Sequence, residues 1–368
     1  MFKDIYKIDW ANISHVYGKS GEIPQKLRDL ISTDIEIREN SIDYLKKNLL
    51  HQFDLIEVHL YIIPFLLELL EIENLSNKEF IIFLLFAIAE ASFPKDSEYE
   101  FQFYLEKVKK EGNENELINY IEGNKFANKV HKEIGTGIDI YLKLLEDSDP
   151  SVREYAAMTL AYCKKKASKI IPILLKQIKS ENNKSTQINM IISLTIINQE
   201  SQYSADYYYN NQNIPLIVEF CLMWRICVLK KEKTPVEIIE KIIEIFMNKY
   251  DDILEEFEDL GWYHFPTPAD ALEYIGIGAK EYFSILLSDF YEKKNEYMLD
   301  DLLYLVFPES IDNKKLNNLT KDQITLLNEL SKASSLWDHD DEYDYPTLLK
   351  LGLPTNRKEI KNLLDVVK

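Results

Sequence analysis

The amino-acid sequence predicts an all-α protein, and three observations support that fold class. In many segments apolar residues recur at three- and four-residue steps, which is the spacing of one buried helix face. Several of these segments begin with residues that cap free backbone amides, as Asp149 does before Pro150. Similar pairs of segments also return along the chain, which is typical of stacked helical repeats.

The composition favours a soluble chain with a large core and a basic partner. The chain has 368 residues, of which 46% are hydrophobic, and its 43 Lys plus Arg against 62 Asp plus Glu give a net charge of -19. Because phosphate backbones and anionic membrane surfaces attract basic proteins, nucleic acid and membrane are disfavoured as partners. The polar N-terminus lacks the apolar core of a signal peptide, and the three cysteines lie in apolar runs, so we expect buried thiols and a cytoplasmic location.

The clearest helix follows Leu145. Asp149 can accept hydrogen bonds from the amides of the first turn, and Pro150 loses no hydrogen bond at the first helical position. After it, Val152, Ala156 and Leu160 recur on one side, while the small alanines allow another helix to approach closely. The pattern therefore predicts a helix that is buried on one face.

A similar helix start occurs near the N-terminus. Asp34 and Arg38 have the same spacing and chemistry as Asp149 and Arg153. A guanidinium could bind a phosphate or a carboxylate from a ligand. We expect a structural role instead, in which each Arg bonds to the Asp of an adjacent turn and satisfies backbone groups at the helix ends.

A second type of helix precedes these segments, and four of its five copies are centred on a proline. The copies read "EIPQKLRDL", "IIPFLLELL", "GIDIYLKLL", "IIPILLKQI" and "NIPLIVEFC". The steps from Pro24 to Pro64, from Asp139 to Pro172 and from Pro172 to Pro215 are 40, 33 and 43 residues. Such a period is typical of solenoids built from paired helices.

The proline-led first helix, the Asp-x-x-Val-Arg start of the second and the period resemble HEAT repeats, most clearly over residues 138–198 and also over 22–93. The pieces "ISHVYGKSGEIPQKLRDL", "NLLHQF" and "LLKLGLPTNRKEIKNLL" resemble a group of bacterial HEAT-repeat proteins of poorly defined function. The resemblance implies a right-handed α-solenoid of stacked antiparallel helix pairs, and it implies no activity.

Because no linker rich in Gly, Pro or Ser interrupts the chain, we expect one continuous solenoid over residues 1–368. Residues 94–137 lack the proline-led start and are either a degenerate repeat or an insertion. Residues 199–213 are polar and aromatic without a helical period, which predicts a long loop. Capping patterns predict further helices after Thr234, Thr267 and Thr320.

The helix that begins at Thr234 is expected to run to about Asp259 and to carry an acidic stripe opposite its apolar side. The stripe would be roughly 30 Å long and would dock a basic partner, with aromatic anchors just beyond it. A solvated face without a partner is the alternative. The predicted partner-binding residues are Glu237, Glu240, Glu244, Asp251, Glu255, Asp259, Trp262 and Tyr263.

The function that the sequence favours is a non-catalytic protein-binding scaffold, such as an immunity or antitoxin-like inhibitor of a basic bacterial toxin. The sequence has no nucleophile elbow, no Cys/His pair and no glycine-rich phosphate loop, so we expect no catalytic residue, no cofactor and no metal. The glycines of residues 276–280 are expected to allow close helix packing. A DNA-binding protein like the alkylated-base glycosylases and an enzyme like the repeat-containing pigment lyases are the two alternatives.

Overall fold

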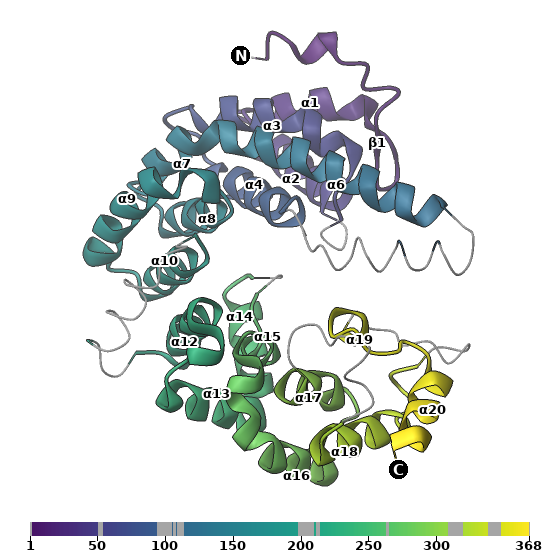
Figure 1. The fold of residues 1–368 in the computed structure, drawn as a ribbon. Coiled ribbons are helices and arrows are strands. Elements are labelled where there is room, and N and C mark those ends of the chain that lie inside the picture. The colour runs from purple at the N-terminus through teal and green to yellow at the C-terminus, as the bar shows by residue number, and fades with distance from the viewer. Residues whose placement is uncertain are drawn as a thin grey trace. The chain divides into compact units, whose positions relative to one another are not determined.

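The computed structural model describes residues 2–50, 54–93, 105, 108, 114–197, 210, 214–262, 265–307, 319–337 and 347–367. The described residues form helices joined by turns, apart from one short antiparallel hairpin of strands β1 (Ser14–His15) and β2 (Gly18–Lys19) (Figure 1). The predicted all-α class is therefore confirmed. None of the helices in these ranges combines the length and the apolar composition that a membrane span requires.

The chain divides into two compact units. Unit 1 consists of residues 1–96 and 118–199, and unit 2 consists of residues 97–117 and 200–368. Each unit has its own core, and each is described by itself below. The single continuous solenoid expected from the sequence stays a prediction.

Unit 1 is built from consecutive helices that pack in pairs. The pairs are α1 (Ile23–Asp29) with α2 (Ile35–Leu49), α3 (Glu57–Leu70) with α4 (Lys78–Ala91), α7 (Ile138–Leu144) with α8 (Pro150–Ala161), and α9 (Ala167–Ser180) with α10 (Lys184–Ile197) (Figure 1). Helix α8 also packs against α4 and α10. Ala156 and Ala157 of α8 are fully buried, so small side chains stand where this helix meets its neighbours.

Short 3-10 helices and one long helix complete the first half of the chain. The 3-10 helices are η1 (Ile5–Lys7), η2 (Ser20–Glu22), η3 (Gly135–Gly137) and η4 (Lys164–Lys166). The long helix is α6 (Asn115–Ile134), which lies within the segment that we expected to be a degenerate repeat or an insertion. Of residues 94–113, only 105 and 108 are described, so the structure leaves that choice open.

The two predicted aspartate caps are confirmed. The side chain of Asp34 accepts a hydrogen bond from the amide of Glu36 at 2.9 Å, and Asp149 accepts one from the amide of Ser151 at 2.9 Å. Each aspartate is the residue immediately before its helix. Both therefore satisfy amides that have no partner inside the helix.

The prolines do not all begin helices as the sequence led us to expect. Pro24 does lie in the first turn of α1, but Pro64 and Pro172 lie inside α3 and α9, which begin at Glu57 and Ala167. A proline inside a helix removes one backbone hydrogen bond, and the packing of the two helices has to offset that loss. The prediction of proline-led starts is therefore wrong for these two helices.

Unit 2 is centred on two helices, α15 (Pro268–Ile275) and α17 (Met298–Val306). Helix α15 packs against α12 (Leu216–Lys230), α13 (Val236–Asn248) and α17, and α17 packs against α16 (Phe283–Lys293) and α18 (Lys321–Leu330). The remaining elements are η5 (Lys231–Lys233), α14 (Tyr250–Asp259), η6 (Gly276–Tyr282), α19 (Thr347–Lys350) and α20 (Arg357–Val367).

Two of the three predicted threonine caps are confirmed. Thr267 and Thr320 form capping boxes with Asp270 and Gln323. Thr234 does not cap α13, because Pro235 is the residue before the helix and the Thr234 hydroxyl donates instead to the carbonyl of Lys231 at 2.6 Å. A short polar side chain can bond backwards as readily as forwards, so this capping prediction is wrong.

Glycine allows the 3-10 helices η5 and η6 to meet closely. A Cβ atom at Gly278 would lie 2.8 Å from the carbonyl oxygen of Glu232 and 2.9 Å from its Cα. The expected packing role of this glycine is thus confirmed. The three cysteines are also buried as free thiols, and burial raises the pKa of Cys163 and Cys227 to about 12.

Candidate functional site

The predicted acidic helix is two helices. Lys249 adopts φ -139° and ψ 22°, which ends α13 at Asn248 and begins α14 at Tyr250. The single straight stripe from Thr234 to Asp259 is therefore wrong. Two shorter acidic rows replace it, and all six predicted carboxylates remain exposed to solvent.

Neighbouring side chains form hydrogen bonds or ion pairs with carboxylates of the acidic row on α13. Its members Glu237, Glu240 and Glu244 fall within about 60° of each other around the helix. The hydroxyl of Tyr282 donates to Glu240 at 3.4 Å, and the Lys249 ammonium lies 3.6 Å from Glu244. Lys241, on the same side of α13, pairs with Glu219 of α12. The charge of this row is thus partly neutralised within unit 2.

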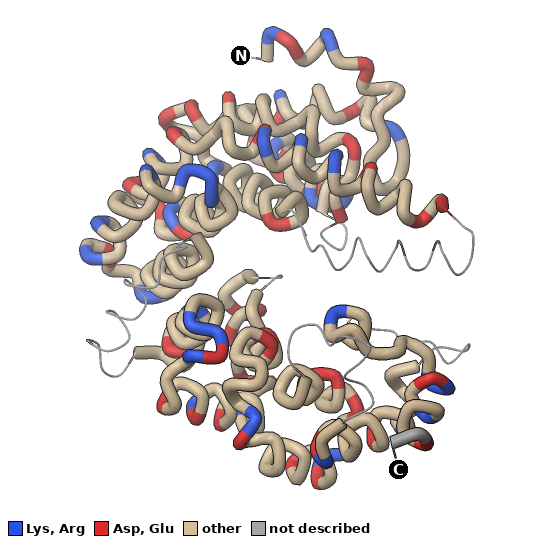
Figure 2. Tube along the Cα trace, viewed as in Figure 1, with Lys and Arg blue, Asp and Glu red and all other residues tan. Residues whose placement is uncertain are grey.

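Helix α14 carries the stronger acidic surface. Six of its ten residues are Asp or Glu, and it has no Lys or Arg (Figure 2). Five of these carboxylates are exposed and lie within about 120° of each other around the helix. None of the five carboxylates makes a hydrogen bond or ion pair within the part of the chain that the structure describes. We call this surface the α14 acidic face, formed by Asp251, Asp252, Glu255, Glu258 and Asp259.

Two of these five residues were missed by sequence analysis. On one continuous helix from Thr234, Asp252 falls about 20° outside the arc of the six predicted carboxylates, whereas Glu258 falls at the angle of Glu240, at the edge of that arc, and was overlooked. The composition of the segment "DDILEEFED" would have found them without any assumption about where the helix begins.

Trp262 is not an aromatic anchor for a partner, because its side chain is fully buried in unit 2. Gly261 has φ +80°, its amide bonds to the carbonyl of Glu258 at 2.9 Å, and the amide of Trp262 bonds to the carbonyl of Phe257 at 3.0 Å. These are the two bonds of a Schellman motif, which turns the chain back onto the helix. The apolar residue after Gly261 therefore packs inward, and "LGW" was the sequence signal for it. Tyr263 lies outside the described residues.

Arg38 and Arg153, the arginines of the two similar helix starts, have the structural role that the sequence predicted. Their hydrogen-bond acceptors differ from the expected aspartate side chains. Arg153 donates to the carbonyls of Asp147 and Ser148 at 2.8 and 3.1 Å, and Arg38 donates to the carbonyl of Ser32 at 2.6 Å. The expected aspartate side chains are not the acceptors. Backbone carbonyls of the preceding turn take the bonds instead, and Arg153 adds a carboxylate from Glu181.

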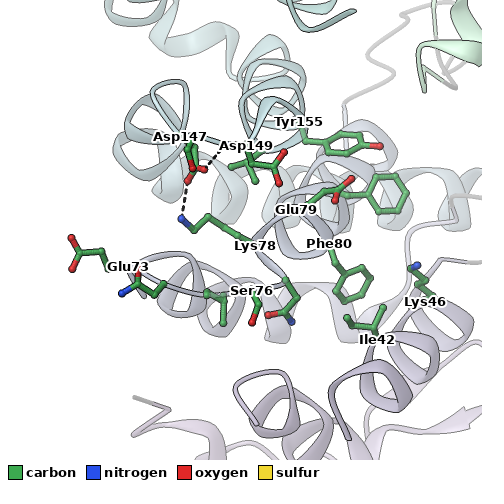
Figure 3. A pocket seen from close by; sticks show the side chains of 16 residues that line it. Ile42, Lys46, Glu73, Ser76, Lys78, Glu79, Phe80, Asp147, Asp149 and Tyr155 are labelled. Carbon is green, nitrogen blue, oxygen red and sulfur yellow. Dashed lines mark hydrogen bonds and ion pairs between the residues drawn. The ribbon is translucent and has the colours of Figure 1, made fainter. Parts of the chain in front are cut away.

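A second candidate site is a groove of about 760 Å³ in unit 1 (Figure 3). It is lined by α2, α4, α8 and the two turns formed by residues 73–77 and 147–149. Lys78 and Asp147 form an ion pair of 2.7 Å on one side of it, with side chains that are 16% and 14% exposed (Figure 3). Burial opposes ionisation of Asp147, but hydrogen bonds from Lys78 and from the Asp149 amide outweigh burial and lower its pKa.

The other side of the groove combines a carboxylate with aromatic rings. Figure 3 shows Glu79 between Tyr155 and Phe80, and the rings of Phe83 and Tyr155 have centroids 5.1 Å apart. The Lys46 ammonium lies 5.7 Å from the centre of the Phe80 ring. A carboxylate beside aromatic faces suits a cationic side chain. The groove can therefore receive a Lys or Arg of a partner, and sequence analysis did not single out these residues.

Comparisons with known proteins do not identify a family for this chain. No family model matches the chain, and no curated protein matches it. Among the described residues, no group of three or more His, Cys, Asp and Glu side chains could hold a metal ion. The HEAT-repeat resemblance accordingly stays a prediction.

Proposed function

We propose that this chain is a non-catalytic protein-binding module and that it binds a basic protein through the α14 acidic face. The observation that carries the proposal is the set of five exposed carboxylates on one side of α14, none of which is paired with a described cation. Like charges at three- and four-residue spacing destabilise a helix by a few tenths of a kcal/mol per pair. A basic partner would remove that repulsion.

The proposed architecture is a right-handed solenoid of HEAT-like helix pairs. The consecutive pairing of helices in unit 1, with α8 packed between α4 and α10, supports it. Solenoids bind macromolecules over extended surfaces. A basic bacterial toxin is the partner class that this chain suits, because an acidic surface both speeds association and covers a face that would otherwise bind nucleic acid.

The test compares two charge-reversed variants in the full chain. Asp252→Lys with Glu255→Lys alters the α14 acidic face, and Glu39→Lys with Asp43→Lys changes the net charge equally on exposed positions of α2. Each variant and the parent chain are used to capture proteins from the native cell. We expect the parent and the α2 variant to recover the same basic protein and the α14 variant to lose it.

The kinetics of that complex separate a docking face from a general effect of charge. We expect the association rate of the parent to fall steeply with salt and that of the α14 variant to be slower and less sensitive to salt. Recovery of the same partners by all three proteins, or a captured partner that is acidic, would show that the α14 acidic face is only a solvated surface.

A further inference from the structure

Unit 1 has another groove beside the one drawn in Figure 3. This neighbour has a volume of about 590 Å³ and is lined by the end of α3, by α7 and by residues of the turns that follow these two helices. Glu73, Lys78 and Asp147 line both grooves, so the two adjoin. We call the groove of Figure 3 the aromatic groove and its neighbour the α7 groove.

The ion pair of Lys78 with Asp147 stands at the border between the two grooves. Lys78 begins α4, and Asp147 lies in the turn between α7 and α8, so the pair connects two consecutive helix pairs. Figure 3 shows this ion pair between Glu73 on one side and Glu79 on the other. Because the two charges of the pair cancel, the carboxylates on either side of it are the charges that a ligand meets.

Both grooves are acidic. The aromatic groove is lined by four carboxylates and two lysines, and the α7 groove by five carboxylates and two lysines. Four of the carboxylates already bind a group of unit 1, which is an ammonium in three cases and a backbone amide in the fourth. The others, Glu71, Glu73 and Glu79, are exposed and make no hydrogen bond or ion pair with any residue that the structure describes. The charge of both grooves therefore favours a cationic ligand.

Apolar side chains lie beside these carboxylates. Phe83 and Tyr155, whose ring centroids are 5.1 Å apart, are half-buried in the lining of the aromatic groove. Ile72 and Ile140 are half-buried in the lining of the α7 groove. Lysine and arginine side chains cover apolar surface with their aliphatic stems and present a cation at the tip, and a cation is also attracted to an aromatic face. Each groove therefore has the two features that suit a basic side chain.

We propose that the two grooves together bind an extended basic segment of a partner protein. One cationic side chain enters the aromatic groove toward Glu79, a second enters the α7 groove toward Glu71 and Glu73, and the backbone between them crosses the border between the grooves. In an extended chain alternate side chains point to the same side, so two basic residues separated by one residue can enter neighbouring grooves. This site does not depend on the α14 acidic face, which belongs to unit 2.

The test measures by fluorescence anisotropy how a labelled peptide binds to the full chain at about 0.15 M salt, where exposed charges more than about 8 Å apart are largely screened. The peptide has about nine residues in which arginine alternates with serine, so that all arginines of the extended chain point to the same side. We expect the parent to bind it with a Kd below about 100 µM. A peptide with glutamine in place of arginine should not bind.

Two variants of the grooves separate the charge from the aromatic surface. Glu73→Gln with Glu79→Gln removes two carboxylates at exposed positions and should weaken the affinity for the arginine peptide at least about fivefold. Phe83→Leu keeps an apolar side chain but removes an aromatic face, and it should weaken the affinity about two- to fivefold. General attraction to an acidic protein would not respond to Phe83→Leu.

Asp252→Asn with Glu255→Gln is the matched control, because it removes the same amount of charge from the α14 acidic face. It should keep the parent's affinity within about twofold. A loss in this control as large as that in the Glu73 and Glu79 variant would overturn the groove proposal while supporting the proposed function. The groove proposal is also overturned if the parent binds the arginine peptide no better than the glutamine peptide, or if either groove variant keeps the parent's affinity.

Discussion

Arg153 and Glu181 form a bidentate ion pair between α8 and the end of α9. The Arg153 Nε donates to Glu181 Oε2 at 2.7 Å, and its Nη2 donates to Oε1 at 2.8 Å. The two side chains are 17% and 4% exposed, so water screens the pair only weakly. Because the same guanidinium also binds two carbonyls of the preceding turn, it links two consecutive helix pairs.

We predict that Arg153→Ala lowers the free energy of unfolding by about 3 kcal/mol, because it leaves the nearly buried carboxylate of Glu181 without its partner. Urea denaturation at neutral pH measures this change. Arg38→Ala is the matched control. Arg38 occupies the equivalent position of the similar N-terminal helix start but bonds only to the carbonyl of Ser32, so its loss should cost about 1 kcal/mol. Equal costs for the two variants would contradict the importance of the carboxylate.

The same pair predicts a dependence of stability on pH. The hydrogen bonds from Arg153 lower the pKa of Glu181, and burial opposes them only in part. Since the pKa in the folded chain lies below the unfolded value of about 4.3, the stabilisation is fully present above that pH and is lost as the pH falls through the folded value. We expect the urea midpoint of the parent to fall more steeply below about pH 4.3 than that of Arg153→Ala. Parallel pH profiles would show that Glu181 is not responsible.

Contacts between residues that are close in the sequence were predictable, and the contact between Arg153 and the distant Glu181 was not. Asp34 and Asp149 were recognised as caps because a cap depends on amides two or three residues away. The partner of Arg153 lies 28 residues further along the chain, and its position depends on how two helix pairs pack. Spacing within one helix carries no information about that packing, which is why an aspartate of the adjacent turn was expected instead.

The acidic residues of α13 and α14 show the same limit of prediction from the sequence. Phe246, Tyr250 and Ile253 keep helical spacing across Lys249, and no Pro or Gly marks the break between α13 and α14. The apolar pattern therefore predicted one helix. Exposure of the acidic residues was predictable from their chemistry, but the direction of Trp262 depended on the turn at Gly261.

Another prediction concerns two adjacent aspartates of α17. The pKa of Asp301 is raised well above its ordinary value, by burial first and then by the charges of Asp300, Asp270 and Glu273. A carboxylate with a raised folded pKa destabilises the fold at neutral pH, and stability is regained as the pH falls through that value. We expect Asp301→Asn to raise the free energy of unfolding at pH 7 by about 1 to 2 kcal/mol, measured by urea denaturation.

Asp300→Asn is the control for that substitution. Asp300 is the next residue in the chain and its carboxylate accepts a hydrogen bond from the Thr347 hydroxyl at 2.8 Å, so its charge is stabilised where that of Asp301 is not. We expect no gain in stability from Asp300→Asn. A gain of the same size in both variants would mean that removing any negative charge stabilises this acidic chain. The buried environment of Asp301 would then not be the cause of the gain in stability.

The close approach of η5 and η6 predicts opposite effects of one substitution at two glycines. At Gly278, an alanine Cβ would lie within 3.0 Å of the carbonyl oxygen and the Cα of Glu232, and backbone atoms cannot move aside as a flexible side chain can. We expect Gly278→Ala to lower the free energy of unfolding by about 1 to 3 kcal/mol. Gly123 lies exposed inside α6, and a Cβ atom there would meet nothing within 4 Å, so Gly123→Ala should raise the free energy of unfolding by about 1 kcal/mol through helix propensity alone. Thermal and urea denaturation of both variants measure the two changes. If Gly278→Ala is as stable as the parent, the turn that carries Lys230, Lys231 and Lys233 is free to shift, and the packing against Gly278 does not fix its position.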